Sequence, residues 1–142
     1  MRIDKNGDLL YREWAPEAAR LTLFGDFNNW HRDQYHATKN EYGQWNLKIP
    51  AKDGQPVIKH GQKFKICIYK NDGSPLDRNP AWARYLVQND QSRLFDPVFW
   101  DPEEKYEFKN PKPKRPVSVR IYEAHVGMSS VEGKVSSYRE FA

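Results

Sequence analysis

The sequence predicts an all-β fold, an antiparallel β-sandwich of immunoglobulin-like type, for most of its length. Three observations predict it: short stretches of alternating apolar and polar residues, turn signals between these stretches, and no stretch with the period of a long helix. A seven-stranded sandwich needs about 100 residues, and the chain has 142. Aromatic residues make up 14% of the chain and can supply much of the core, because each ring buries roughly 150–250 Å².

Strands are expected wherever apolar and polar residues alternate between turn signals. The clearest alternation is in residues 62–70, where Phe64, Ile66 and Ile68 face one way, so we expect this strand to be central. Residues 31–40 are polar and irregular and are expected to form a loop. In chain order, the expected strands are 9–14, 20–24, 42–49, 62–70, 84–87 and 105–109.

A proline-rich segment divides the chain. Residues 1–109 are expected to form the sandwich, and residues 110–116, with a proline at every second or third position, an extended linker. Residues 117–126 are apolar without strict alternation, which is typical of a strand covered on both faces in a parallel sheet. Ser137 and Glu140 then form a Ser-x-x-Glu capping box, which opens a helix.

The strand–loop–helix order of residues 117–142 is that of the first unit of an α/β domain whose remainder is absent. A helix of one turn is marginal in water, because its first hydrogen bond fixes several dihedral angles. We therefore expect the chain to be a fragment of a longer protein. The alternative is a natural tail in which the capping motif occurs by accident.

The overall composition excludes several classes of function. The 23 basic and 19 acidic residues are interspersed, and the net charge of +4 is too diffuse to indicate nucleic acid. No stretch is long and apolar enough to cross a membrane. Cys67 is the only cysteine, which excludes a disulfide within the chain and fits a reducing compartment. The four histidines lack metal-ligand spacing, and we expect no metal and no cofactor.

The candidate binding residues gather where the strand at residues 20–24 ends. Trp30 follows in a connection, where a large ring either folds back as a plug or stays exposed as a platform for a flat ligand. Sugar rings have apolar C–H faces and polar rims, so their sites combine an exposed aromatic plane with hydrogen-bonding groups. Asn28, Asn29 and Asp33 supply such groups beside Trp30. We expect the platform.

Two blocks of sequence resemble a known family. The first is Tyr-Arg-Glu-Trp-Ala-Pro at 11–16 with Gly-Asp-Phe-Asn-Asn-Trp at 25–30, which resembles the glucan-binding β-sandwich at the front of starch- and glycogen-branching enzymes. The second is Pro-Lys-Arg-Pro at 113–116 with Arg-Ile-Tyr-Glu-Ala-His-Val-Gly-Met-Ser-Ser at 120–130. It is similar to the entry into the catalytic barrel of eukaryotic-type 1,4-α-glucan branching enzymes.

This resemblance implies an activity for the parent protein. Branching enzymes transfer an α-1,4-glucan segment to a 6-hydroxyl by a retaining mechanism, with two carboxylic acids on the rim of a (β/α)₈ barrel. Those acids lie on later strands than any in residues 1–142, so the resemblance implies that this chain has no catalytic residue and is inactive alone. It implies as partners α-1,4-glucan or malto-oligosaccharide, in glycogen or starch, together with the missing barrel. It also implies a cytoplasmic location, or a plastid in a plant-type source.

The same resemblance implies further sugar-binding residues. Tyr42, Gly43 and Trp45 look like the tyrosine, glycine and tryptophan with which plant-type relatives hold malto-oligosaccharide beside the counterpart of Trp30. Trp45 also shares parity with Leu47 and Ile49, so an equal alternative is that it lies in the core.

Lys65 resembles the lysine in the sugar site of the glycogen-binding modules of kinase regulatory subunits. The alternative is a solvated strand lysine. Those modules carry a second tryptophan shortly after the lysine, whereas residues 73–76 here read Gly-Ser-Pro-Leu. This departure implies a weak affinity.

The remaining candidates are expected to be structural. Trp14, Trp82 and Trp100 are interpreted as packing anchors, and Glu123 and His125 as part of a domain junction. Two other classes of function stay open. One is a non-catalytic adaptor or brace, in which the aromatics contact a protein. The other is a binder of anionic polymers, which predicts steep salt dependence.

Overall fold

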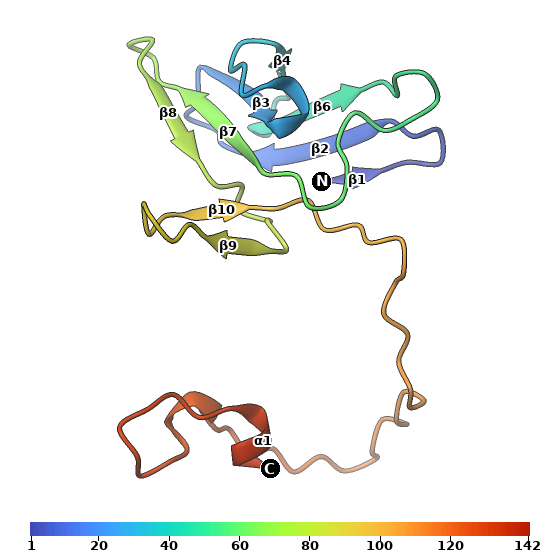
Figure 1. Ribbon diagram of the computed structural model, residues 1–142, viewed down its shortest axis with the longest axis vertical. Helices are drawn as coiled ribbons and strands as arrows, with labels where there is room; N and C mark the ends of the chain where they lie inside the picture. Colours follow the sequence, from blue (N-terminus) through green and yellow to red (C-terminus); the bar gives the residue numbers. More distant parts are fainter. The chain divides into compact units, whose positions relative to one another are not determined.

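A computed structural model describes all residues, 1–142, and its main feature is a pair of antiparallel four-stranded sheets. Figure 1 shows the two sheets as layers that face one another in the first part of the chain. The first sheet has the order β1 (Arg2–Ile3), β2 (Leu9–Trp14), β6 (Gln44–Ile49) and β5 (Thr38–Lys39). The second sheet has the order β4 (Tyr35–His36), β3 (Arg20–Gly25), β7 (Phe64–Tyr69) and β8 (Pro75–Arg78).

The core lies between these two sheets, because each strand turns its alternate apolar side chains inward. On β2 the inward residues Leu9 and Tyr11 are buried, whereas Arg12 and Trp14 on the opposite face are exposed. The buried core cluster takes residues from both sheets and from the connections: Leu9, Tyr11, Ala18, Leu21, Leu23, Ala37, Trp45, Ile49, Ile58, Phe64, Ile66 and Phe99. The predicted all-β, antiparallel architecture is confirmed.

The strand predicted to be central, β7, is an inner strand, paired with β3 on one side and β8 on the other. The stretch 31–40, expected to be a loop, contains the two short strands β4 and β5. They were not recognised because strands of two residues are too short to show a period.

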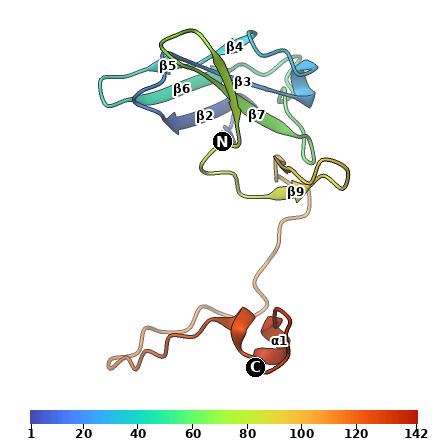
Figure 2. The same cartoon turned by 90° about the vertical axis from the view of Figure 1, so that its left-hand side faces the viewer.

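A separate two-stranded hairpin follows the second sheet. It consists of β9 (Leu86–Gln88) and β10 (Phe95–Pro97), both labelled in Figure 1, and Figure 2 shows β9 outside the two larger sheets. The helical elements are η1 (Asp26–Asn28) and η2 (Val126–Met128), both 3₁₀ turns, and the four-residue α1 (Tyr138–Phe141). None of the helices has the length and apolar composition needed to cross a membrane.

By its internal contacts the chain divides into two units, residues 1–106 and 107–142. In the second unit the predicted capping box is confirmed. The Ser137 hydroxyl accepts the Glu140 N–H at 3.3 Å, and the Glu140 carboxylate accepts the Ser137 N–H at 2.8 Å.

Two predicted strands are absent. Neither residues 105–109 nor residues 117–126 form a strand, apart from Val126, which begins η2. The side chains of Val117 and Ile121 are fully or largely exposed. The composition of 117–126 is that of a buried strand, but a strand needs a neighbour to take up its backbone hydrogen bonds, and this chain supplies none. The start of a barrel is therefore not seen as an element.

Candidate functional site

The turn after β3 sets the position of Trp30. Gly25 ends the strand against the start of β7, so closely that a Cβ atom there would lie 2.3 Å from the Lys63 carbonyl oxygen. After η1, both Asn29 (φ 53°) and Trp30 (φ 60°) adopt the left-handed conformation, which is rare for a bulky side chain. The Trp30 N–H donates to the Gly25 carbonyl at 2.8 Å and closes the turn. Such strain is typical of functional sites.

Asn28 braces this turn from inside. Its side chain is buried, its Oδ1 accepts the Gly25 N–H at 2.9 Å, and its Nδ2 donates to the His31 carbonyl at 2.7 Å. Asn28 was expected to contact a sugar directly, but both of its polar atoms are already bonded to the backbone. Asn29, by contrast, is exposed at the tip of the turn.

The Trp30 indole lies on the outer face of the second sheet, not between the sheets. Its Nε1 donates to Asp26 Oδ1 at 2.9 Å, and its ring meets the Phe24 ring edge-on at 5.7 Å. Phe24 belongs to an outer-face cluster with Cys67 and Tyr69 that is separate from the sandwich core. With 37% of its surface exposed, Trp30 is held in place on one side and open to solvent on the other.

Lys65 lies directly across the sheet from Phe24, on the same outer face. Its Nζ pairs with Asp96 Oδ1 at 3.0 Å, and Lys63 pairs with the other oxygen of Asp96 at the same distance. Burial raises the pKa of Asp96, but the hydrogen bonds from Lys65 and Lys63 outweigh this, and the pKa is lowered overall. A ligand on Lys65 therefore has to compete with Asp96.

Arg32 was not recognised from the sequence, yet it forms part of this face. Its guanidinium lies 5.1 Å from the centroid of the Phe24 ring. It also forms a bidentate pair with Asp77 on β8, in which Nε donates to Oδ1 at 2.9 Å and the terminal amino group donates to Oδ2. Asp77 lies 45 positions away in the chain, and no local pattern links the two residues.

Asp33 closes the other side of the same face. Its carboxylate accepts the Tyr69 hydroxyl and pairs with Arg20 at 3.3 Å, while the Arg20 guanidinium lies over the Tyr69 ring. The hydrogen bond to Asp33 raises the pKa of Tyr69. We call this whole region the Trp30 surface; it consists of Phe24, Trp30, Arg32, Asp33, Lys65 and Tyr69.

The Arg32–Asp77 pair predicts a dependence of stability on pH. The hydrogen bond from Arg32 lowers the pKa of Asp77 below its usual value near 4. A lowered carboxyl pKa stabilises the fold above the unfolded-state pKa, and this stability is lost as the pH falls through the folded-state pKa. We expect Asp77→Asn to flatten the decline in the free energy of unfolding below pH ~5, measured by urea unfolding at several pH values.

Asp90→Asn is the matched control, because Asp90 is exposed and has no hydrogen-bond or ion-pair partner. An equal change in the two variants would show that the Arg32–Asp77 pair makes no specific contribution.

The second predicted cluster is only partly accessible. Tyr42 is 72% exposed, but Trp45 is 4% exposed in the sandwich core, where its Nε1 donates to the Ala15 carbonyl at 2.8 Å. The indole of Trp45 thus has no free face for a sugar. Gly43 has φ 74° and packs on Pro16, which leaves no room for a Cβ.

Trp14 takes the exposed place beside Tyr42 instead. It was interpreted as a packing anchor, but it is 65% exposed, and its Nε1 donates to the Tyr42 carbonyl at 3.1 Å. Outward-facing positions on a strand alternate with core positions, and Trp14 follows the buried Glu13. The alternation of buried and exposed positions along β2 could have identified Trp14 as an outward-facing residue.

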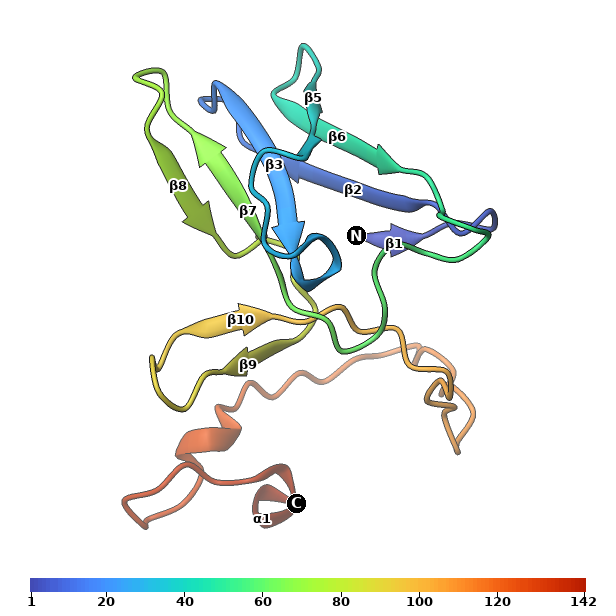
Figure 3. The same cartoon turned by 45° about the horizontal axis from the view of Figure 1, so that its top comes forward.

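The two clusters flank β3 in the chain; Figure 3 shows this strand beside β7 in the second sheet. Trp30 follows the last residue of β3, whereas Trp14 precedes its start by a short connection. A six-residue strand spans about 17 Å. No hydrogen bond or ring contact joins Trp30 to Tyr42.

A third group of exposed aromatics lies around the β9–β10 hairpin. Trp82 and Trp100, also interpreted as packing anchors, are largely exposed. Trp100 contacts the rings of Tyr85 and His60, both at 4.7 Å between centroids. The larger exposed apolar residues here are Trp82, Tyr85, Leu86, Leu94, Phe95 and Trp100. We call this group the hairpin surface.

An antiparallel sandwich that holds an indole on the outside of one sheet, among charged and amide side chains, is the architecture of a carbohydrate-binding module. The chain belongs to the family of carbohydrate-binding module 48, the isoamylase N-terminal domain, which it matches over residues 1–83.

Similar curated proteins are 1,4-alpha-glucan-branching enzymes. The enzyme of Rhizophagus irregularis is 47% identical over 137 residues, covering 96% of this chain and 20% of the relative. That of Yarrowia lipolytica is 46% identical over 145 residues, covering 99% and 21%. In Pisum sativum, 1,4-alpha-glucan-branching enzyme 1, chloroplastic/amyloplastic, is 47% identical over 137 residues, covering 93% and 16%. The chain thus spans about a fifth of the length of these relatives, and the resemblance seen in the sequence is confirmed.

Among solved structures, the fold resembles the catalytic module of the multi-modular glycogen-degrading pneumococcal virulence factor SpuA. The TM-score is 0.52 at 16% identity, over 69% of this chain and 15% of that one. A product complex of the same factor gives 0.52 at 17% identity, over 70% and 11%. At this identity the likeness concerns the fold alone.

Proposed function

We propose that the chain is the α-glucan-binding N-terminal portion of a 1,4-α-glucan branching enzyme and that the Trp30 surface holds the glucan. The observation that carries this proposal is the Trp30 indole, fixed by its hydrogen bond to Asp26 and open on its other side. The family and the branching-enzyme relatives support the substrate class.

The chemistry of the Trp30 surface suits a glucosyl ring. The indole offers an apolar plane for the C–H face of the sugar, and Asn29 in the same turn, with Asp33 and Lys65 on the same outer face, carries groups that can bond hydroxyls. Asn28 acts indirectly by holding the turn. The surface is open, and Lys65 is already paired with Asp96, so the polar contacts around the indole contribute little and the overall affinity is weak.

The second cluster offers a separate contact for a long chain. Tyr42 is accessible there, with Gly43 shaping the turn and Trp45 supporting it from the core. A glucan long enough to reach from the outer face of the second sheet to the Tyr42 turn engages both clusters. Linking two weak contacts in this way increases the overall affinity.

The hairpin surface has a different role in this proposal: it contacts another protein domain rather than the glucan. Its exposed rings form an apolar area of the kind that marks protein contacts, and the partner we propose is the catalytic barrel of the parent enzyme. Residues 110–116 act as the linker and residues 117–142 as the first βα piece of that barrel, which would supply the neighbours that the predicted strand lacks. The proposal places the parent branching enzyme in the cytoplasm, or in the plastid if the source is a plant.

Calorimetric titration with maltoheptaose, combined with ¹⁵N–¹H NMR, tests the binding function. We expect weak binding with shift changes centred on residues 26–33, on Lys65 and on the Tyr42 turn. Cellohexaose, with β-linked glucose, is the control ligand. Shift changes confined to the hairpin surface, or none with maltoheptaose, would support the adaptor function instead.

A second assay tests the assignment of catalysis to the rest of the parent. Incubation of the purified 142-residue chain with amylose is expected to produce no α-1,6 linkage, since the resemblance to branching enzymes implies that the catalytic carboxylates lie on later barrel strands. New branch points, detected by isoamylase debranching and chain-length analysis, would contradict this.

A further inference from the structure

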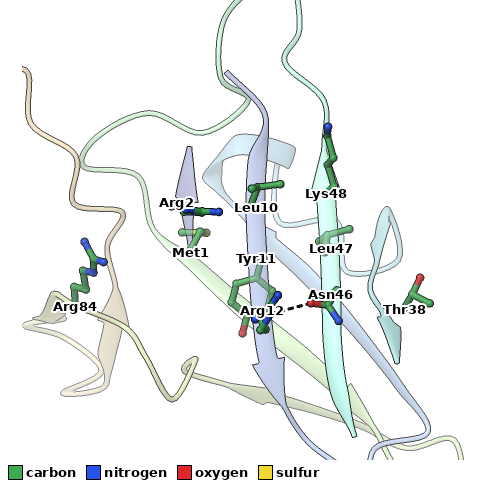
Figure 4. A pocket seen from close by; sticks show the side chains of 10 residues that line it. All are labelled: Met1, Arg2, Leu10, Tyr11, Arg12, Thr38, Asn46, Leu47, Lys48 and Arg84. Carbon is green, nitrogen blue, oxygen red and sulfur yellow. Dashed lines mark hydrogen bonds between the residues drawn. The ribbon is translucent and has the colours of Figure 1, made fainter. Parts of the chain in front are cut away.

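A hollow of about 690 Å³ lies over the first sheet (Figure 4). The Trp30 surface belongs to the other sheet of the sandwich, so the two lie on opposite outer faces. Its charged rim is formed by Arg2, Arg12, Lys48 and Arg84, and Leu10 lies among them on β2. This size suits a small molecule. Four basic residues and no acidic one line the hollow, which distinguishes it from the mixed charges of the rest of the chain.

The strand register explains why the cations meet. Arg2 on β1 pairs with Leu10 on β2, and Arg12 is two residues further along β2, on the same outer face. Diagonal neighbours on a sheet have their Cβ atoms about 7–8 Å apart, within reach of long side chains. Arg2 and Arg12 can therefore bind one anion together. Figure 4 shows both side chains on this face, with Arg84 on the segment beside it.

Most of this positive charge has no partner in the protein. Lys48 pairs with Asp8 at 2.8 Å, which raises the pKa of Lys48 and lowers that of Asp8. Arg2, Arg12 and Arg84 make no ion pair with any carboxylate. The Arg12 Nε donates to Asn46 Oδ1 at 3.0 Å, which orients the guanidinium and leaves its two terminal amino groups unbonded.

We propose that this hollow binds the phosphate monoester group of a phosphorylated sugar. Guanidinium groups match phosphate oxygens in pairs of parallel hydrogen bonds, and an oriented, unpaired arginine is well suited to this. Leu10 offers an apolar floor for a sugar ring, while Asn46 and Thr38 can bond hydroxyls. This site is independent of the neutral-glucan site, because the two share no residue.

The proposed ligand has two sources, a free sugar phosphate or a phosphate ester on a glucan chain. Both present the same group to Arg2 and Arg12. The two ligands differ in whether they also reach the Trp30 surface. Only a phosphorylated glucan chain is long enough to contact the hollow and the Trp30 surface at the same time. Binding of a free sugar phosphate is therefore unaffected by Trp30→Ala, whereas binding of a phosphorylated maltodextrin is weakened by it.

NMR titration of the full 142-residue chain with glucose 6-phosphate tests the proposal, with glucose and inorganic phosphate as the comparison ligands. We expect shift changes at residues 10–12 and 46–48 with both phosphate compounds, larger with glucose 6-phosphate, and none with glucose. Arg12→Gln is expected to weaken binding about tenfold or more by removing a charge-assisted bidentate contact, and Arg2→Gln to do so as well.

Arg78→Gln is the matched control, because it removes the same charge from an exposed position on β8, in the other sheet. It is expected to leave the affinity unchanged. Thermal unfolding of each variant checks that the fold is retained, and two separate arginine variants keep the test valid if one is unstable. Equal weakening by Arg78→Gln, or shift changes spread over all basic residues, would overturn the proposal in favour of non-specific charge attraction.

Discussion

Replacing Trp30 with alanine is expected to weaken the binding of maltoheptaose by about 10- to 100-fold, with a loss of stability too small to unfold the domain. An aromatic side chain that carries a binding site typically contributes about 2 kcal/mol or more, and 1.4 kcal/mol corresponds to a tenfold change in affinity. The substitution removes the contact with Phe24 and the hydrogen bond to Asp26, but the fold is retained because the indole lies outside the sandwich core. Calorimetric titration of both proteins measures the difference.

Trp82→Ala is the matched control for this variant. It removes an indole of the same size from an exposed position on the hairpin surface and is expected to leave maltoheptaose binding unchanged. Trp30→Phe keeps a ring but loses the hydrogen bond to Asp26, so it should fall between the wild type and the alanine variant. If both tryptophan-to-alanine variants bind as well as the wild type, Trp30 is not the platform.

Replacing Glu13 with alanine is expected to destabilise residues 1–106 by about 3 kcal/mol, because it leaves the buried Tyr11 hydroxyl and two partly buried backbone N–H groups without their acceptor. The carboxylate is buried at the edge of the core. It accepts the Tyr11 hydroxyl at 2.8 Å, the Trp14 N–H at 3.0 Å and the Ala81 N–H at 3.1 Å. These bonds tie β2 to the segment that leads to the hairpin. A loss of this size lowers the melting temperature of a domain of about 100 residues by roughly 10–20 °C.

Two further variants separate the causes. Glu17→Ala, at an exposed position nearby in the chain, should have almost no effect on the melting temperature. Glu13→Gln preserves the shape but exchanges one acceptor for a donor, so its effect should be smaller than that of alanine. If Glu13→Ala melts at the wild-type temperature, the three hydrogen bonds do not contribute to stability.

The sandwich could be predicted because its strands are half buried. In β2, β6 and β7 the alternation of apolar and polar residues reports directly which face meets the core. The same parity places Trp45 beside Ile49 in the core, which decides between the two interpretations of that residue. Burial in a two-layer fold thus leaves a pattern that a single sequence reveals.

The details of the Trp30 surface could not be predicted, because they depend on pairings between distant segments. The contribution of Arg32 requires Asp77 from another strand, and the partial neutralisation of Lys65 requires Asp96 from the hairpin. The bracing role of Asn28 depends on two backbone groups that only the folded turn brings to it. None of these contacts has a local signature.

For residues 117–126 the sequence predicted an element that the structure does not contain. Their composition predicts a strand, but composition reports how a segment would be buried, not whether the covering layers are present. The exposed rings of Trp14, Trp82 and Trp100 show the same limit. Each was assigned to packing on the basis of residue type, although residue type alone does not say what lies opposite.

The fixed backbone of Asn29 and Trp30 has a kinetic consequence. In the proposed function the ring already stands in the orientation in which it contacts the glucan, because the turn is held by the Gly25 carbonyl and by Asp26, so binding requires no rearrangement. Nothing closes over the polymer afterwards either, and residence on so shallow a surface is brief. A module with these properties binds and releases in rapid succession. A long polysaccharide can therefore move along the surface while it stays near the protein.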